Sequence, residues 1–137
     1  DVIQMLNGCI GGLVAITAEP LMPSPLASIL IGAVGGVIVV YGTKLLFSLK
    51  IDDVVGAIPA HLFAGIWGTL AVPITNSGAS FGTQLLGVVS INAFVFIVSF
   101  IVWFLMKSTF GIRLSKEGET KGTDVTETGV IAYAIRD

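Results

Sequence analysis

The chain has 137 residues, of which 54% are hydrophobic and only 12% are charged, and its formal net charge is −2. Soluble domains carry about 25% charged residues, so the composition excludes an ordinary soluble domain and indicates an integral membrane protein. The acidic balance leaves no basic surface for phosphate groups, which argues against nucleic-acid binding. The single cysteine, Cys9, can form no internal disulfide and cannot bind a metal alone.

Three stretches contain no Asp, Glu, Lys or Arg: residues 2–18, 20–43 and 54–106. About 20 apolar residues in a helix cross the roughly 30 Å hydrocarbon core of a bilayer. Helices also satisfy their own backbone hydrogen bonds inside lipid. We therefore expect an all-α integral membrane protein that crosses the bilayer several times.

Four membrane helices are predicted from the breaks between them. The first ends at AEPLMPSP, where three prolines in six residues interrupt any helix. The second begins with Pro25, which suits a first helical turn, and the third follows Asp53, a favoured N-cap residue. The loop PITNSGASFG separates the third helix from the fourth. The predicted helices cover about residues 2–18, 25–47, 54–74 and 83–107, in a transmembrane region 1–107 that precedes a polar cytoplasmic tail, 108–137.

The basic residues predict how these helices are oriented. Loops 19–25 and 73–82 contain no Lys or Arg, whereas Lys44 and Lys50 lie near the connection between the second and third helices. The remaining basic residues lie in the tail or at its start. Positive residues mark the cytoplasmic side of a membrane protein. The beginning of the chain, this connection and the tail are therefore all expected to be cytoplasmic.

Small residues recur on the first three predicted helices. They let helix backbones approach closely in a bilayer, where lipid supplies no hydrophobic drive for association. On the first two helices we expect tight packing and nothing more. These residues are Gly8, Gly11, Gly12, Gly32, Gly35 and Gly36 on the first two helices, and Gly56, Ala60, Ala64 and Gly68 on the third.

The only histidine, His61, lies in the longest charge-free stretch. At a rise of 1.5 Å per residue it stands roughly 12 Å from Asp53. An ionisable residue at such depth is costly and tends to face a cavity or a pathway. Pro59 is expected to kink or open the helix beside it. The small residues expected on the same helix face, where they would leave space beside the ring, are Ala57, Ala64, Gly65 and Gly68.

The residues alone leave two interpretations of His61 open. One is a functional ring in a pathway, and the other is a neutral histidine that hydrogen-bonds a neighbouring helix. Metal binding is not expected, because the chain has no second histidine and no carboxylate shares the helix face. The sequence also shows no nucleophile–base pair, phosphate loop or metal cluster, so we expect neither an enzyme nor a cofactor.

The stretch DDVVGAIPAHLFAGIWGTLA resembles the penultimate-helix motif of the ammonium transporter (Amt/Rh) family. The preceding LNGCIGGLVAITAEPLMPSPLASILIGAVGGVIVV resembles the two helices before that motif. The tail FGIRLSKEGETKGTDVTETGVIAY resembles the cytoplasmic C-terminal region of the family. The resemblance covers essentially the whole chain in the same order. It implies that these are the last four of eleven membrane helices.

The resemblance implies a function. Family members conduct ammonium or ammonia through a hydrophobic pore in each subunit of a homotrimer. A pair of histidines lines this pore, and His61 matches the second of them, while Asp53, Pro59 and Gly65 belong to the supporting motif. The implied location is the bacterial inner (plasma) membrane, in which the protein is multi-pass. The alternatives are an ammonium sensor coupled to signalling through its tail, and a purely structural membrane fragment.

The resemblance also implies a regulatory tail. In the family this region packs under neighbouring subunits and is linked to control by the PII signalling protein. Some positions depart from the family pattern: Gly56 stands where some members have an acidic residue, Thr128 where a His is common, and Val130 and Ile131 where polar residues are common. The tail residues that match and that we expect to be regulatory are Gly111, Arg113, Gly122, Asp124 and Tyr133.

Overall fold

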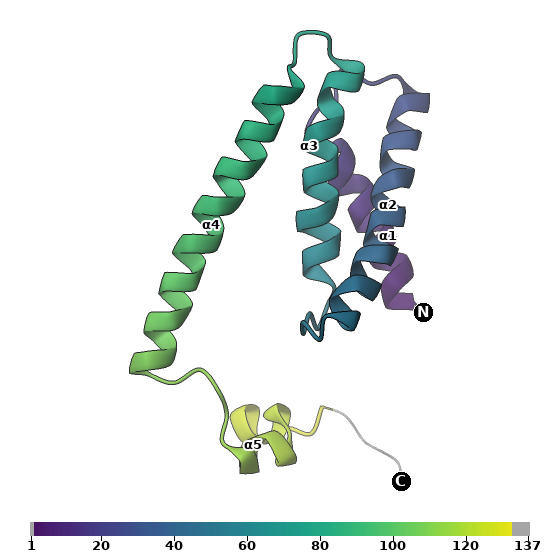
Figure 1. Ribbon diagram of the computed structural model, residues 1–137. Coiled ribbons are helices and arrows are strands. Elements are labelled where there is room, and N and C mark those ends of the chain that lie inside the picture. The colour runs from purple at the N-terminus through teal and green to yellow at the C-terminus, as the bar shows by residue number, and fades with distance from the viewer. Residues whose placement is uncertain (1, 133–137) are drawn as a thin grey trace. The chain divides into compact units, whose positions relative to one another are not determined.

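The computed structural model describes residues 2–132, which contain helices and connecting segments and no β-strand (Figure 1). Two compact units, Asp1–Ala93 and Phe94–Asp137, divide the chain. The first unit holds the helices around His61, and the second contains the tail. The tail residue Tyr133 lies outside the described residues.

Prolines and a capping side chain define the bounds of the first two helices. Helix α1 covers Val2–Ile16 and stops before the proline-rich loop. Helix α2 covers Pro25–Ser48. Its N-cap is Ser24, whose hydroxyl oxygen accepts a hydrogen bond from the backbone N–H of Ala27 at 3.3 Å. The side-chain cap and the proline in the first turn together define the start of this helix.

The third membrane helix differs from the prediction at its start. It opens as a π-helix, η1, over Ile58–Phe63 and continues as the α-helix α3 over Ala64–Thr75. The predicted start near residue 54 is wrong, because Val54 and Val55 form a turn and Gly56 adopts a φ of 73°. That left-handed conformation suits glycine and cannot continue a right-handed helix.

The remaining helices are one long apolar segment and two short polar ones. Helix α4 covers Phe81–Thr109, α5 covers Lys116–Lys121, and the π-helix η2 covers Asp124–Thr128. By length and composition, three helical segments can cross a membrane: Pro25–Ser48, Ile58–Thr75 and Phe81–Thr109. Helix α1 is equally apolar and has 15 residues. The predicted all-α membrane class is confirmed, and three of the four predicted membrane helices reach spanning length within the described residues.

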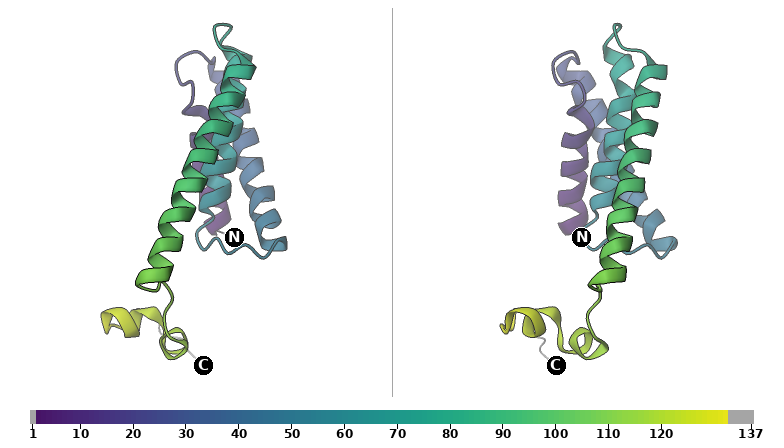
Figure 2. Two further views of the ribbon diagram at one scale, coloured as in Figure 1. Left: turned by 60° about the vertical axis from the view of Figure 1, so that its left-hand side comes forward. Right: turned by 90° about the vertical axis from the view of Figure 1, so that its left-hand side faces the viewer.

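Helices α1, α2 and η1–α3 lie side by side in both sets of views (Figures 1 and 2). The contacts depend on the small residues that the sequence singled out. A Cβ added to Gly12 would lie 3.1 Å from the carbonyl oxygen of Gly32, and one added to Gly35 would lie 2.7 Å from that of Gly11. One added to Gly68 would collide with the carbonyl oxygen of Ala15. The predicted close approach of the backbones is therefore confirmed.

Two small apolar clusters fill the space between these helices. Trp67 packs against the first cluster and donates a hydrogen bond from its indole nitrogen to the carbonyl oxygen of Ile31 at 3.0 Å. This hydrogen bond replaces the bond to water that the indole N–H loses when the ring packs between the helices. The clusters are formed by Ala15, Ile31 and Ala71, and by Val39, Ala60 and Ala64.

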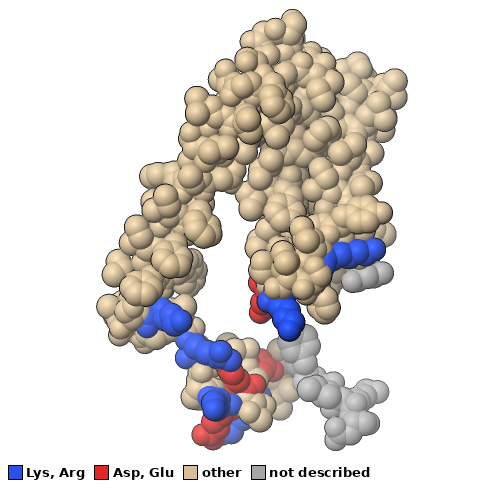
Figure 3. Space-filling model, in the orientation of Figure 1, with Lys and Arg blue, Asp and Glu red and all other residues tan. Residues whose placement is uncertain are grey.

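The described charged side chains of this first unit lie toward its ends, with Glu19 in the loop between α1 and α2 and the others near the connection between α2 and η1. On the face shown in Figure 3, Lys, Arg, Asp and Glu side chains of the unit appear at one end only. Lys50, Asp52 and Asp53 belong to the connection between α2 and η1. This arrangement leaves a long uncharged body that matches the hydrocarbon region of a bilayer.

The Gly68–Ala15 contact generates a prediction. Gly68→Ala should lower the free energy of unfolding of the intact protein by about 1–3 kcal/mol, the usual cost of overpacking. The cost arises because the opposing atom is backbone, so the helices must separate. Chemical unfolding in detergent micelles measures it. Gly8→Ala is the control, since nothing lies within 4 Å of its added Cβ, and an equal loss in both variants would contradict the prediction.

Candidate functional site

Asp53 caps the helix that carries the histidine. Its two carboxylate oxygens accept hydrogen bonds from the backbone N–H groups of Ala57, at 2.9 Å, and Ile58, at 2.8 Å. These two N–H groups belong to the first helical turn, where backbone N–H groups find no acceptor within the helix itself. The predicted capping bonds of the Asp53 side chain are confirmed, although Asp53 lies four residues before Ala57, the residue that precedes η1. The neighbouring Asp52 is exposed and makes no hydrogen bond among the described residues.

The π-helix determines which side chains share a face with His61. The backbone N–H of Ala64 donates to the carbonyl oxygens of His61 and of Pro59, the latter five residues earlier, and not to the carbonyl four residues earlier as in an α-helix. Each residue of this turn is therefore rotated less about the axis than in an α-helix. The faces predicted with α-helical spacing consequently shift around this segment.

His61 is exposed within the described residues and lies in a groove of about 310 Å³. One wall consists of Leu62, Gly65, Ile66 and Thr69, from η1 and α3. The other wall consists of α4 residues from Gln84 to Asn92, and both walls belong to the unit Asp1–Ala93. The imidazole has no hydrogen-bond partner among residues 2–132. Its nitrogens are therefore available to a ligand or to another segment.

The structure brings some of the predicted site residues together and separates others. Gly65 lines the groove with His61, and a Cβ added to it would lie 3.8 Å from its nearest neighbour, so open space exists there. Ala64 and Gly68 do not lie on this face, and that part of the prediction is wrong. Ala64 is fully buried, at 0% exposure, and Gly68 packs on Ala15. The i→i+5 bonds of η1 account for the difference.

Pro59 lies away from the groove. It is among the most deeply buried side chains, below 2% exposure. A Cβ added to Gly42 of α2 would lie 3.1 Å from the Cβ of Pro59 and 2.7 Å from a ring carbon of Phe63. Pro59 therefore contributes to the site by fixing η1 against α2 and not by lining the groove.

Three polar residues of the groove were missed at the sequence level. Thr69 donates from its hydroxyl to the carbonyl oxygen of Gly65 at 2.9 Å, and Asn92 donates from its amide to that of Val88 at 2.7 Å. Gln84 completes the polar lining. Their signal was available, since each is a hydrogen-bonding side chain within the charge-free stretch 54–106.

A second, larger hollow of about 720 Å³ lies at the charged end of the unit. Its lining comes from the end of α2, the following loop and Pro59, and it includes Lys50, Asp52 and Asp53. Among the described residues, no group of three His, Cys, Asp or Glu side chains could hold a metal ion. The polar groups here can bind small donors or acceptors.

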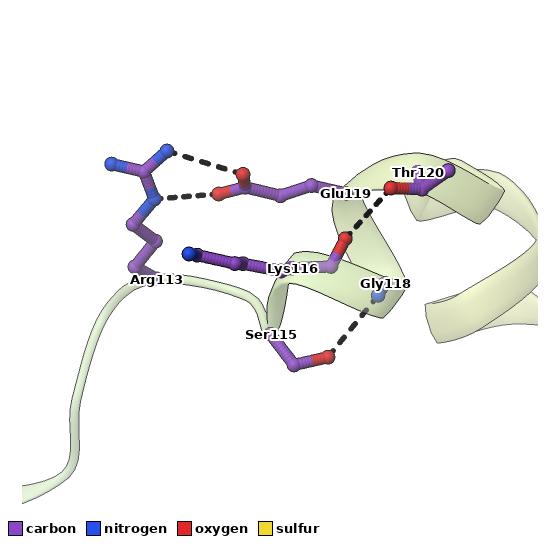
Figure 4. A network of polar contacts seen from close by, with 6 residues as sticks. All are labelled: Arg113, Ser115, Lys116, Gly118, Glu119 and Thr120. Atoms are coloured by element: carbon purple, nitrogen blue, oxygen red, sulfur yellow. Dashed lines mark hydrogen bonds and ion pairs between the residues drawn. The ribbon is translucent and has the colours of Figure 1, made fainter.

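The tail forms its own polar network (Figure 4). Ser115 caps α5, accepting the backbone N–H of Gly118 at 3.1 Å. Arg113 donates two hydrogen bonds to Glu119, at 2.6 and 3.1 Å. This bidentate pair holds the segment before α5 against its last turn.

Of the other tail residues expected to be regulatory, Gly111 and Gly122 lie in connecting segments and Asp124 begins η2. Gly111 and Gly122 have φ angles of 71° and 95°, which glycine adopts readily. The carboxylate of Asp124 accepts the backbone N–H of Ala132 at 2.9 Å. A side chain at position 122 would crowd this carboxylate, since an added Cβ would lie 2.6 Å from it. The position of the Asp124 carboxylate therefore requires a residue without a side chain at position 122.

The Arg113–Glu119 pair shifts the pKa of both groups. The hydrogen bond from Arg113, more than the charge alone, lowers the pKa of Glu119, and the same bond raises the pKa of Arg113. Both side chains are exposed to solvent. The consequence is local: the pair is stable at neutral pH and is lost when the carboxylate is protonated.

Apolar helices of spanning length, joined at glycine-lined contacts, define a multi-pass α-helical membrane protein. Residues 1–133 match the model of the Ammonium Transporter Family. The chain is 35% identical to ammonium transporter Amt2 of Archaeoglobus fulgidus, over 97% of this chain and 33% of that protein. It is 36% identical to ammonium transporter Amt1 of Haloferax mediterranei, over 97% of this chain and 27% of that protein.

The chain thus belongs to the ammonium transporter family, as the sequence motifs indicated. It spans about a third of the length of the curated relatives that it matches. These relatives are named as transporters.

The cap at Asp53 generates a prediction for the intact protein. Asp53→Ala should lower the free energy of unfolding by about 1 kcal/mol, the usual cost of a lost N-cap. Asp52→Ala is the matched control and should change it by less than about 0.5 kcal/mol, as for an exposed residue without partners. Chemical unfolding in detergent distinguishes them. Equal effects of the two substitutions would show that Asp53 is no cap.

The tail pair generates a second prediction. Because the pKa of Glu119 is lowered on folding, its stabilising contribution is present above the ordinary range of a glutamate, about 4.3, and is lost as the pH falls through the lowered pKa. An NMR titration should place the pKa of Glu119 below that range, and Arg113→Gln should return it there. Lys121→Gln is the control, since Lys121 pairs with Glu117 at 3.0 Å. A pKa of Glu119 within the ordinary range in the unsubstituted protein would show that the pair with Arg113 does not form.

Proposed function

We propose that the intact protein conducts ammonium or ammonia across a membrane through a hydrophobic pore, to which this chain contributes His61. The observation that carries the proposal is membership of the ammonium transporter family over residues 1–133. The relatives are named as ammonium transporters, and His61 is the one imidazole in a stretch without charged residues.

The environment of His61 supports a role in conduction. The neutral imidazole can donate and accept hydrogen bonds and can pass a proton without remaining charged. The groove beside it contains no charged side chain among the described residues, and Leu62, Ile66, Val88 and Ile91 supply its apolar lining. A dry, apolar passage disfavours a bare cation. In the proposed mechanism ammonia therefore crosses the middle of the membrane, and its proton moves separately.

The proposed pore contains a second histidine, contributed by another segment of the intact protein and hydrogen-bonded to His61. The free ring nitrogens of His61 support this pairing. In the proposal Asp53 fixes the start of the helix, Pro59 anchors it to α2, and Gly65 keeps the space beside the ring open.

The proposal extends to assembly and location. The intact protein is a homotrimer in the bacterial inner membrane, and the tail lies on the cytoplasmic side with the Lys and Arg residues. The tail couples subunits and meets the PII signalling protein. The residues proposed for this regulation are Gly111, Arg113, Gly122, Asp124 and Tyr133. An ammonium sensor is the alternative, and a measurement of net ammonium flux distinguishes it from a transporter.

Replacement of the histidine tests the pore. His61→Leu keeps an apolar side chain of similar size but removes the hydrogen bonds and the proton path. In the intact protein, reconstituted in liposomes, the ammonium-driven current per assembled molecule should fall roughly 10²-fold or more, as when a positioned proton-transfer group is lost. Cys9→Ala, at an exposed position of α1, is the control and should leave the current unchanged.

The opposite result has a definite meaning. A His61→Leu protein that assembles normally and carries an unchanged, proton-coupled ammonium current would show that His61 only packs between helices. Size-exclusion chromatography of both variants before reconstitution establishes that the compared molecules are equally assembled.

A further inference from the structure

The turn before η1 is held by a side chain from another helix. The amide nitrogen of Asn7, on α1, donates a hydrogen bond of 2.7 Å to the backbone carbonyl oxygen of Val55, 48 residues away in sequence. In a continuous helix this carbonyl would accept the N–H of residue 59. That residue is Pro59, which has no N–H. Asn7 therefore supplies the donor that the local sequence lacks.

The same amide group fits against Gly56. A Cβ added to Gly56 would collide with the amide nitrogen of Asn7. Gly56 is buried and has a φ of 73°. The missing side chain thus does two things: it allows the left-handed turn, and it makes room for the amide that bonds the preceding carbonyl.

Helix α2 holds η1 from a different direction. Pro59 and Phe63 close on Gly42, and Ala60 packs in the cluster with Val39. Asp53 caps the first turn. With its start bonded to α1 and its buried face packed on α2, the π-helical turn has little freedom to rotate. His61 projects from the part of this turn that remains exposed.

We propose that Asn7 is a positioning residue for His61: its hydrogen bond to the carbonyl of Val55 keeps η1 in π-helical geometry and so determines where the imidazole points. The inference rests on the proposed role of His61 in conduction. Without the amide donor, the carbonyl of Val55 loses its bond to α1, and Pro59 has no N–H to replace it. The turn then rearranges to recover a bond, and the ring moves with it.

The test uses the intact protein in liposomes, with ammonium and methylammonium as the transported probes. Asn7→Leu removes the donor at similar volume, and Asn7→Gln retains an amide donor. Gln4→Leu is the matched control, because Gln4 is also on α1 and donates from its amide to a carbonyl of α2, that of Val40, at 3.4 Å. The readouts are the two transport rates per assembled molecule and the amide hydrogen exchange of residues 57–64.

Asn7→Leu should lower the ammonium rate about tenfold, in the range that small misplacements of a working group produce. It should also change the ratio of the ammonium to the methylammonium rate and speed the exchange of residues 57–64. Asn7→Gln should recover the ratio at least in part, and Gln4→Leu should leave it unchanged. A purely structural role of Asn7 would lower both rates alike and leave their ratio constant, which would overturn the proposal.

Two further outcomes separate this inference from the proposed function. A lost current in His61→Leu together with an unchanged rate and ratio in Asn7→Leu would overturn the positioning role alone. An unchanged current in His61→Leu would overturn the pore role of His61 and the inference with it. If Asn7→Leu does not assemble, Asn7→Ala removes the same donor with a smaller side chain. A changed ratio of the ammonium to the methylammonium rate in Asn7→Ala then supports the positioning role, and an unchanged ratio overturns it.

Discussion

Backbone contact between helices is the constraint on which the first unit depends. Gly12 faces Gly32 with little room for a methyl group, whereas Gly35 against Gly11 and Gly68 against the carbonyl of Ala15 leave no room for one. Helices that approach this closely gain dispersion contacts along their length, which is the main source of association in a medium where apolar burial gives no advantage. The contacts also fix the rotation of each helix. The position of every side chain on η1 and α3, including His61, follows from them.

The π-helix is the second determinant of the site, and it arises where several local preferences conflict. Gly56 ends the preceding turn in a left-handed conformation, Asp53 caps the next helix, and Pro59 withholds a donor one turn later. A single turn with i→i+5 bonds reconciles these demands. Such turns are uncommon and often lie at functional sites, since they point side chains in directions that an α-helix does not provide. Here the shift moves Ala64 into the core and leaves Gly65 beside the histidine.

The sequence predicted those features that depend on composition and on single residues. Charge-free stretches indicated membrane helices, Asp53 indicated a cap, and the glycines indicated close packing. The residue motifs indicated the family. Features that depend on competition between neighbours could not be predicted in this way. α-Helical spacing placed Ala64 and Gly68 beside His61, because Pro59 indicated a local opening of the helix but not that its hydrogen bonds would shift to i→i+5. The bond from Asn7 to Val55 joins residues 48 positions apart, and only the packing of α1 on the third helix brings them together.

The exposure of the Arg113–Glu119 pair has a consequence for the tail. Exposed ion pairs contribute little to stability, and dissolved ions compete with them. Salt therefore weakens the attraction between exposed charges such as these, and near the ionic strength of a cell the screening length is about 8 Å. The short helix α5 has six residues, too few to be stable by itself in water. Its order therefore depends on a few polar contacts, and the salt concentration of the surrounding solution becomes a factor that sets how much of the tail is folded.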